Sequence, residues 1–134
     1  MRPVADTGLL KALLDRNDPF HFWAKDVFPK HAPWFTCEAV LTETAHLTRA
    51  PRKVMQLVAR GDLQIRFSAE SEAERLAELL GKYCDNEMEL ADACLVRMAE
   101  LENLAVIFTL DRRDFSVYRK NGNQPVPCSY PPNV

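Results

Sequence analysis

Apolar residues return at helical spacing in several stretches of the 134-residue chain. Leucines at positions 9, 10, 13 and 14 predict a helix that begins after the Thr7-Gly8 corner. Thr36 and Ser68 stand before two other such stretches, and we expect both to act as N-caps because a hydroxyl can accept a hydrogen bond from the first turn. The helices predicted after the first cover residues 19–28, 37–47, 51–61, 69–83 and 88–102. The last of these is apolar on almost every side, which predicts that it is largely buried.

Strand signals lie between the predicted helices. Val4-Ala5 is a short apolar lead, residues 63–67 alternate apolar with polar side chains, and residues 104–110 form a continuous apolar run. Such a continuous run is typical of a strand inside a parallel sheet that is covered on both faces. Strands that alternate with helices predict an α/β fold, a three-layer α/β/α sandwich with a mostly parallel central sheet, in one domain over residues 1–134. The proline-rich segment 125–134 is expected as an edge strand or a tail.

Composition narrows the class of protein. The hydrophobic fraction of 47% and the charged fraction of 27% are ordinary for a globular chain. With 17 basic and 19 acidic residues the net charge is −2, so the chain as a whole lacks the basic composition of many nucleic-acid-binding proteins. This does not exclude a local group of basic residues around an acidic site. No segment has the pattern of a membrane span or a signal peptide, and we expect a cytoplasmic protein. The four cysteines form no Cys-x-x-Cys pair, which favours reduced thiols over a zinc site.

Four carboxylates stand where solvated acids are not expected. Asp6 follows the first predicted strand and Asp111 follows the predicted central strand, and the carboxyl ends of neighbouring parallel strands share one edge. Asp92 lies among small and aliphatic residues on the helix predicted to be buried, and Glu43 lies on an apolar face of its helix. Two such charges about 4 Å apart repel by about 4 kcal/mol at an effective dielectric of about 20. A hard divalent cation such as Mg²⁺ or Mn²⁺ would relieve that repulsion.

Each acid also has a simpler interpretation. Asp6 could only cap the helix that follows it, and Asp92 could be a first-turn acid of a helix that begins later than predicted. Asp111 and Asp114 could be turn residues, and Glu43 could face solvent if its helix is rotated. These interpretations stay open for each residue alone, but all would have to hold together for no cluster to form.

The chain resembles the PIN-domain family, and most of all its VapC-like toxins, in four motifs and in the order in which they follow one another. They are "ADTGLLKALLDRNDP" at 5–19, "TCEAVLTETAHL" at 36–47, "MELADACLVRMAEL" at 88–101 and "IFTLDRRDF" at 107–115. The resemblance runs from Val4 to about Tyr118 and implies a PIN-like fold. Pro3 and the proline-rich tail depart from the pattern, away from the acids. Because Pro3 has no N–H, we expect sheet pairing to begin at Val4.

The resemblance implies that the four carboxylates described above form a metal site. Asp6, Glu43, Asp92 and Asp111 would hold Mg²⁺, for which Mn²⁺ would substitute. Asp114 would be a further catalytic acid, which shares the position of Asp111 or supports it. Which of these last two contacts the metal directly stays open at the level of sequence.

The resemblance also implies the chemistry and the partners. Hydroxyls of Thr7 and Thr109 would hold a water or a phosphate oxygen, and candidate phosphate contacts are Arg49, Arg52, Lys53, Arg112 and Arg113. The implied activity is Mg²⁺-dependent endonucleolytic hydrolysis of RNA that leaves 5′-phosphate and 3′-hydroxyl ends. The implied partners are an RNA substrate, a cognate antitoxin and a second copy in a homodimer. Two alternatives remain, namely a catalytically silent PIN-like protein that binds RNA or a partner, and a magnesium phosphohydrolase of small phosphoesters.

Overall fold

Five parallel strands form the central sheet of the structure, a computed structural model that describes all residues 1–134. They are β1 (Arg2–Ala5), β2 (Trp34–Thr36), β3 (Leu63–Ile65), β4 (Ala105–Phe108) and β7 (Cys128–Ser129), in the spatial order β3-β2-β1-β4-β7. Because every ladder in this sheet is parallel, all five strands end at the same edge. A separate antiparallel ribbon joins β5 (Arg119–Lys120) to β6 (Gln124–Pro125).

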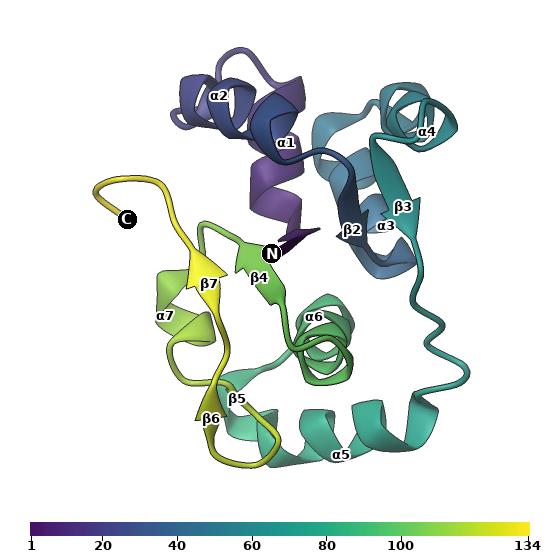
Figure 1. The fold of residues 1–134 in the computed structure, drawn as a ribbon, viewed down its shortest axis with the longest axis vertical. Coiled ribbons are helices and arrows are strands. Elements are labelled where there is room, and N and C mark those ends of the chain that lie inside the picture. Colours follow the sequence, from purple (N-terminus) through teal and green to yellow (C-terminus); the bar gives the residue numbers. More distant parts are fainter.

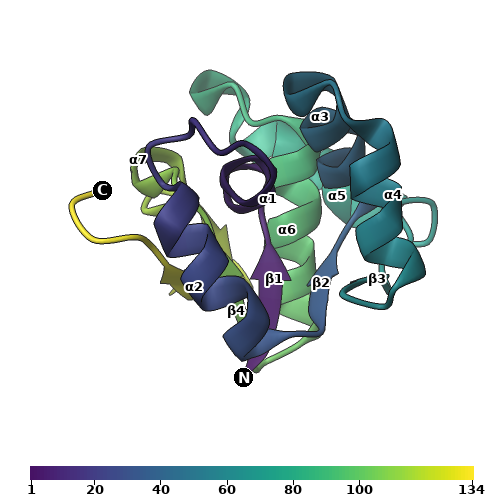
Figure 2. The same cartoon turned by 90° about the horizontal axis from the view of Figure 1, so that it is seen from above.

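Helices cover both faces of the sheet, as Figures 1 and 2 show. One face carries α1 (Thr7–Leu14), α2 (His21–His31), α3 (Glu38–Thr48) and α4 (Pro51–Ala59), and the other carries α5 (Ala73–Lys82) and α6 (Leu90–Leu101). Two short elements, η1 (Cys84–Asn86) and α7 (Arg112–Phe115), precede α6 and follow β4. The predicted three-layer α/β/α sandwich with a parallel sheet is confirmed.

The helix predicted to be largely buried is α6. It packs on β4 and beneath α5, and its buried residues are Ala91, Ala93, Cys94, Leu95, Val96, Met98 and Ala99. Small side chains allow its backbone to approach the sheet, while Leu95 and Val96 fill the space between neighbouring elements. Because α6 is fixed in this way, the acid in its first turn is carried by one of the most rigid parts of the core.

Two predicted helix caps are wrong. Thr36 belongs to β2, and its buried hydroxyl donates a hydrogen bond of 2.7 Å to the carbonyl of Ala5 across the sheet. Cys37 precedes α3 instead and makes no side-chain cap. Ser68 accepts a hydrogen bond from the N–H of Ser71, but α5 begins only at Ala73. A hydroxyl can serve a strand or a turn as well as a helix end, and in both places tertiary packing decided which.

The prediction that pairing begins at Val4 is also wrong, because β1 pairs with β4 from Arg2 onwards. The N–H of Arg2 donates to the carbonyl of Leu104, just before β4, at 2.8 Å, and the N–H of Asp6 donates to the carbonyl of Phe108 at 3.1 Å. N–H groups alternate sides along a strand, so the nitrogen of Pro3 points away from β4. The proline therefore costs no hydrogen bond in that ladder.

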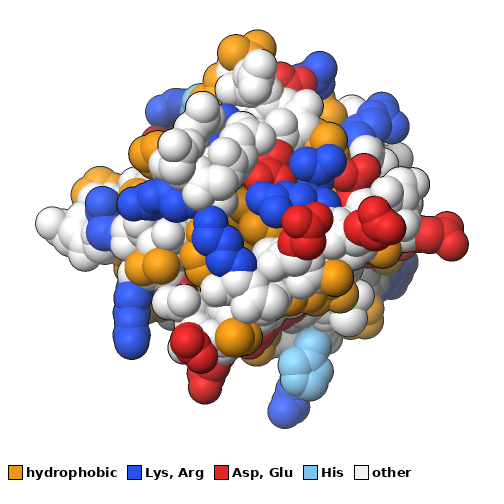
Figure 3. Space-filling model, turned by 90° about the horizontal axis from the view of Figure 1, so that it is seen from below, with side chains coloured by type: hydrophobic (Ala, Val, Ile, Leu, Met, Phe, Trp, Pro, Cys, Tyr) orange, Lys and Arg blue, Asp and Glu red, His pale blue; other side chains and the backbone are white.

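A buried carboxylate ties α5, α6 and the antiparallel ribbon together. Glu100, whose side chain is 1% exposed, accepts hydrogen bonds from Arg75 at 2.7 Å, Arg97 at 3.1 Å and the N–H of Asn121 at 2.7 Å. Burial opposes ionisation of Glu100, but these hydrogen bonds outweigh it and lower its pKa to about 2. The face on which α5 lies correspondingly mixes basic, acidic and apolar side chains (Figure 3), with no surface of a single charge.

Replacing Glu100 by Gln should lower the free energy of unfolding by about 2 kcal/mol at pH 7, because two guanidinium groups lose their shared anion. The folded-state pKa lies below the ordinary value, so this contribution is present above about pH 4.5 and disappears as the pH falls toward 2. Urea denaturation across that range measures it. Glu78→Gln is the control, since that side chain is 68% exposed and lies 3.8 Å from Arg75. Equal losses in the two variants would contradict this account.

Candidate functional site

The parallel pairing of β1 with β4 places the residues after these strands side by side. Ala5 lies opposite Phe108 in the ladder, so Asp6 and Thr109 emerge together at the carboxyl edge. The Thr109 hydroxyl donates a hydrogen bond of 2.6 Å to Oδ2 of Asp6, across 103 residues of sequence. Thr109 is completely buried and Asp6 is 8% exposed, so solvent does not compete for this contact.

Asp6 is also the N-cap of α1. Its backbone is extended, and its Oδ1 accepts a hydrogen bond of 2.7 Å from the N–H of Thr7. Gly8 lets the chain beyond β4 come close, because a Cβ at that position would stand 2.8 Å from Cγ of Leu110. Asp6 therefore caps α1 as the simpler interpretation expected, but capping is not its only role, because Thr109 binds its other carboxylate oxygen.

Asp111 lies three residues beyond the end of β4, in the turn that leads into α7. Its Oδ1 accepts a hydrogen bond of 3.0 Å from the N–H of Asp114, which makes Asp111 the cap of this short helix. Its own N–H donates to Oγ1 of Thr109 at 3.0 Å. Thr109 therefore links the backbone of Asp111 to the carboxylate of Asp6. The strand ends earlier than predicted, and the turn interpretation of Asp111 is confirmed.

Asp92 lies in the first turn of α6, because that helix begins at Leu90. The Tyr118 hydroxyl donates a hydrogen bond of 2.9 Å to its Oδ2. Tyr118 is fully buried, with its ring edge-on to Tyr83 and Phe115 at centroid distances of 5.1 and 5.2 Å. A tyrosine packed in this way holds Oδ2 in place and leaves Oδ1 available.

All five candidate acids line one cavity of about 270 Å³ at the carboxyl edge. No apolar or basic side chain lines it. Its residues come from the β1–α1 junction, α3, the η1–α6 segment and the β4–α7 turn: Asp6, Thr7, Glu43, Asn86, Glu87, Glu89, Asp92, Asp111 and Asp114. Seven of these nine carry carboxylates, so the fold concentrates negative charge where the four segments meet.

Burial and mutual repulsion resist ionisation of these acids. Burial raises the pKa of Asp6 to about 6, and the charges of Glu43 and Asp111 add to the effect. Burial likewise raises the pKa of Asp92 to about 7, with Asp6, Asp111 and Asp114 adding to it. The acids from separate segments are therefore close enough to act on one another electrostatically.

The family model of the PIN domain matches residues 4–121, which is most of the chain. The chain belongs to the PIN-domain family. The resemblance carried by the four sequence motifs is thereby confirmed, and the matched region contains every residue that lines the acidic cavity.

Two relatives of this PIN domain come from Mycobacterium tuberculosis. Ribonuclease VapC26 is 29% identical over 126 residues, which cover 89% of this chain and 93% of the relative. The crystal structure of VapC20, described as a sarcin-ricin loop cleaving toxin, matches with a TM-score of 0.67 and 21% identity over 78% of this chain and 86% of that one. At this identity the structural likeness shows the fold alone. Separately, none of the helices has both the length and the apolarity that crossing a membrane requires.

The chemistry of the acidic cavity in this PIN domain suits a hard divalent cation. Every candidate ligand is an oxygen, and the buried Oγ1 of Thr7 has no hydrogen-bond partner. As the side chains lie, no three acids stand close enough to hold one ion. Asp6, Asp92 and Asp111 are each held by a hydrogen bond, and each carboxylate keeps unused lone pairs. Mg²⁺ retains several waters and needs few protein ligands, so direct contact with three acids is not required.

Six of the residues predicted to act at the site do not line the acidic cavity: Thr109, Arg49, Arg52, Lys53, Arg112 and Arg113. Thr109 is buried behind Asp6 and positions it. Arg49 is exposed at the end of α3, with left-handed backbone at φ 54°. Arg112 is exposed, stacks 4.1 Å from the ring centroid of Tyr130 and donates to the carbonyl of the last residue. The fold therefore brings Thr7 and the acids together but leaves Arg49 and Arg112 away from them.

Sequence reasoning missed three residues of this site. Asn86 and Glu87 lie between the helices predicted at 69–83 and 88–102, yet both line the cavity. Nothing local marks them, because their position depends on how α5 and α6 pack. Tyr118 was missed as the partner of Asp92, although a tyrosine in an otherwise apolar environment needs a partner for its hydroxyl.

Replacing Asp92 by Asn should stabilise the protein in the absence of metal, because one crowded charge disappears while the amide oxygen still accepts from Tyr118. We expect the free energy of unfolding at pH 8 in chelator to rise by about 1 kcal/mol. The folded-state pKa of Asp92 is raised, so wild-type stability falls as the pH rises from 4 through 7, and at pH 4 the variant should gain little. Urea denaturation at both pH values, with exposed Asp85→Asn as control, measures this. An equal gain at both pH values would contradict the crowding.

Proposed function

We propose that this PIN domain is a Mg²⁺-dependent endoribonuclease and the toxin of a toxin–antitoxin pair. The observation that carries the proposal is the acidic cavity, in which seven carboxylates from separate segments meet without a single basic side chain. Such a cluster is costly in a folded protein unless protons or a cation neutralise it. The cluster lowers the stability of the protein and lies at the carboxyl edge of a parallel sheet, where α/β proteins bind their ligands. Both facts support a functional role for these acids.

RNA is the substrate class that the relatives support. VapC26 is named a ribonuclease, and the match spans nearly its whole length. VapC20 is described as cleaving the sarcin-ricin loop. The description of VapC20 as a toxin supports a cognate antitoxin as a partner. A homodimer is proposed because the resemblance to VapC-like toxins implies it.

Asp6, Glu43, Asp92 and Asp111 would hold the cation, with Mn²⁺ as a substitute for Mg²⁺. When bound, the ion makes water more acidic and stabilises negative charge on a phosphodiester. Between the two acids of the last motif we favour Asp111 as the direct ligand. Thr109 hydrogen-bonds both the carboxylate of Asp6 and the N–H of Asp111, which ties Asp111 to Asp6, whereas Asp114 makes no hydrogen bond to Thr109. Asp114 instead donates its N–H to Asp111 and orients it.

Asp92 is suited to take the proton of the attacking water. Its Oδ2 is occupied by Tyr118, so Oδ1 is the oxygen that can act as a base. The hydroxyl of Thr7 has no partner within the protein and can donate to a non-bridging phosphate oxygen. Attack of water on phosphorus with departure of the 3′-oxygen leaves a 5′-phosphate and a 3′-hydroxyl.

A second polar hollow indicates where a neighbouring phosphate would lie. It has a volume of about 340 Å³, is lined by Arg113 and shares Asn86, Glu87 and Asp114 with the acidic cavity. Arg113 forms no ion pair within 4 Å. Among the basic residues of the sequence, we therefore favour Arg113 for contact with the RNA backbone.

Purified protein should cut total RNA in Mg²⁺, and chelator should abolish the cleavage. Asp92→Asn should reduce the rate at least about 100-fold, because it removes a ligand and the proton acceptor together. Asp26→Asn, which removes an exposed acid of α2 that lines neither the acidic cavity nor the second hollow, should keep wild-type activity. End-labelling should find 5′-phosphates on the products. Undiminished cleavage by Asp92→Asn, or cleavage in chelator, would overturn the proposal.

Binding of Mn²⁺ distinguishes the proposed nuclease from a catalytically inactive PIN-like protein. Calorimetric titration with Mn²⁺ should show saturable binding to the wild type and loss of that binding in Asp92→Asn, while Asp85→Asn binds as the wild type does. Absence of binding at millimolar Mn²⁺ would instead favour a PIN-like protein that only grips RNA or a partner.

A further inference from the structure

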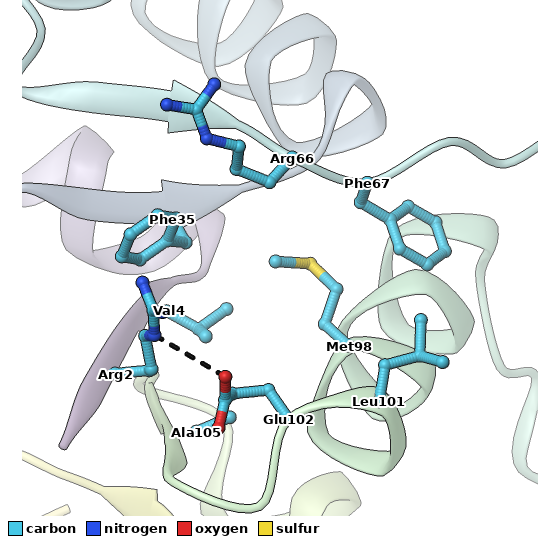
Figure 4. A pocket seen from close by; sticks show the side chains of 9 residues that line it. All are labelled: Arg2, Val4, Phe35, Arg66, Phe67, Met98, Leu101, Glu102 and Ala105. Atoms are coloured by element: carbon cyan, nitrogen blue, oxygen red, sulfur yellow. Dashed lines mark ion pairs between the residues drawn. The ribbon is translucent and has the colours of Figure 1, made fainter.

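A third hollow lies at the other end of the molecule from the acids. It has a volume of about 330 Å³ and opens between β2, the chain after β3 and the last turn of α6 (Figure 4). Arg2 and Ala105, which begin β1 and β4, stand at its base, so it belongs to the amino edge of the sheet. The residues around it are Arg2, Val4, Phe35, Arg66, Phe67, Met98, Leu101, Glu102 and Ala105. None of them takes part in the proposed hydrolysis.

The hollow exists because the sheet is incompletely covered on this side. Trp34 and Thr36 point to the opposite layer and are completely buried, whereas Phe35 between them points to the α6 side and is only half buried. The guanidinium of Arg2 lies 5.0 Å from the ring centroid of Phe35 and covers it only in part. Met98 reaches from α6 into the hollow toward Phe35, and Phe67 lies on the same side as Met98 (Figure 4). The floor and walls are therefore apolar and accessible.

Exposed aliphatic side chains continue the apolar surface beyond the hollow. Leu101 on its rim is 55% exposed. Leu104 is 62% exposed, and its carbonyl accepts a hydrogen bond from the N–H of Arg2, which keeps it next to the mouth. Met1 precedes Arg2 and is 59% exposed. Apolar side chains that gather around a hollow mark an interaction site more often than scattered ones do.

The mouth carries positive charge. The aliphatic stem of Arg66 lines the hollow while its guanidinium points outward (Figure 4), where it contacts only Gln64 at 3.0 Å and no carboxylate. Arg2 pairs with Glu102 at 3.5 Å, and both of these side chains are about half exposed. One guanidinium at the mouth is thus unmatched, and the opening favours an anionic neighbour over a cationic one.

We propose that this hollow is a docking site for an acidic segment of a partner protein, which inserts one large apolar side chain. The volume is at the lower end of that of ligand pockets, so it admits a side chain and not a whole element. An aromatic or aliphatic anchor in a hollow with a charged rim is the common form of an interface hot spot.

Two other occupants fit the hollow less well. RNA would place phosphates beside Glu102 and beside the exposed Leu101 and Leu104, which offer a phosphodiester backbone nothing. A second copy of this chain on a twofold axis would set hollow against hollow and leave both unfilled. RNA lacks the apolar anchor, and the twofold arrangement seats no side chain in either hollow.

Fluorescence anisotropy with labelled peptides tests the proposal on the full chain. The probe is Asp-Glu-Asp-Trp-Leu-Glu-Asp. Two control peptides carry Lys in place of the acids, or Ser in place of Trp and Leu. We expect the probe to bind saturably with a Kd below about 1 mM and each control peptide to bind at least about tenfold more weakly. Arg66→Glu and Leu101→Asp should each weaken probe binding by a similar factor. Arg60→Glu and Met55→Asp, which are exposed on α4 and at its end, should not.

Three results would overturn the proposal. The first is absence of probe binding, or equal binding of all three peptides or by all variants. The second is conversion of a dimer to a monomer by Leu101→Asp in light scattering, which would assign the face to a second copy. The third is displacement of the probe by single-stranded oligouridylate, in chelator, from both wild type and Asp92→Asn, because competition that does not depend on the acidic cavity would assign the hollow to RNA. RNA cleavage by Arg66→Glu should equal that of wild type, so this test stands apart from the proposed nuclease activity.

Discussion

A buried hydrogen bond of 2.6 Å between the Thr109 hydroxyl and the Asp6 carboxylate joins the ends of β1 and β4. The acidic edge of the sheet depends on this contact. Thr109 also accepts the N–H of Asp111, and Asp111 in turn caps the helix that carries Asp114. Parallel pairing of β1 with β4 therefore sets the position of three acids at once. The fourth segment, α6, brings Asp92 to the same place, where Tyr118 holds it.

Interactions elsewhere in the fold offset the destabilising effect of the acidic cavity. Burial raises the pKa values of Asp6 and Asp92, so ionisation of both weakens the folded state near neutral pH. The closely packed alanines of α6 and the buried Glu100 with its two arginines oppose that loss. The contrast between the two buried acidic centres is instructive. Glu100 is matched by cations from the chain itself, whereas the acidic cavity has none and is open to a cation from outside.

Much of the fold followed from periodicity, because the amphipathic helices and the apolar run before Asp111 bury the faces that their sequences predict. Predictions from local sequence were wrong where contacts between distant segments determine the structure. Thr36 serves a strand and not a helix, and Pro3 is tolerated because its nitrogen faces away from β4. The acids could be recognised because a carboxylate in an apolar setting is conspicuous. Asn86 and Glu87 are polar residues in a polar turn, so only the packing of α5 against α6 reveals that they line the cavity.

The central claim is that the acids from separate segments form one divalent-cation site. Crystals grown or soaked with Mn²⁺ test it most directly, through the anomalous signal of the metal. The account predicts a peak in the acidic cavity, within about 2.5 Å of carboxylate oxygens of both Asp6 and Asp92, with Asp111 nearer to it than Asp114. A peak bound only to surface acids elsewhere, or an empty cavity at millimolar Mn²⁺, would contradict it.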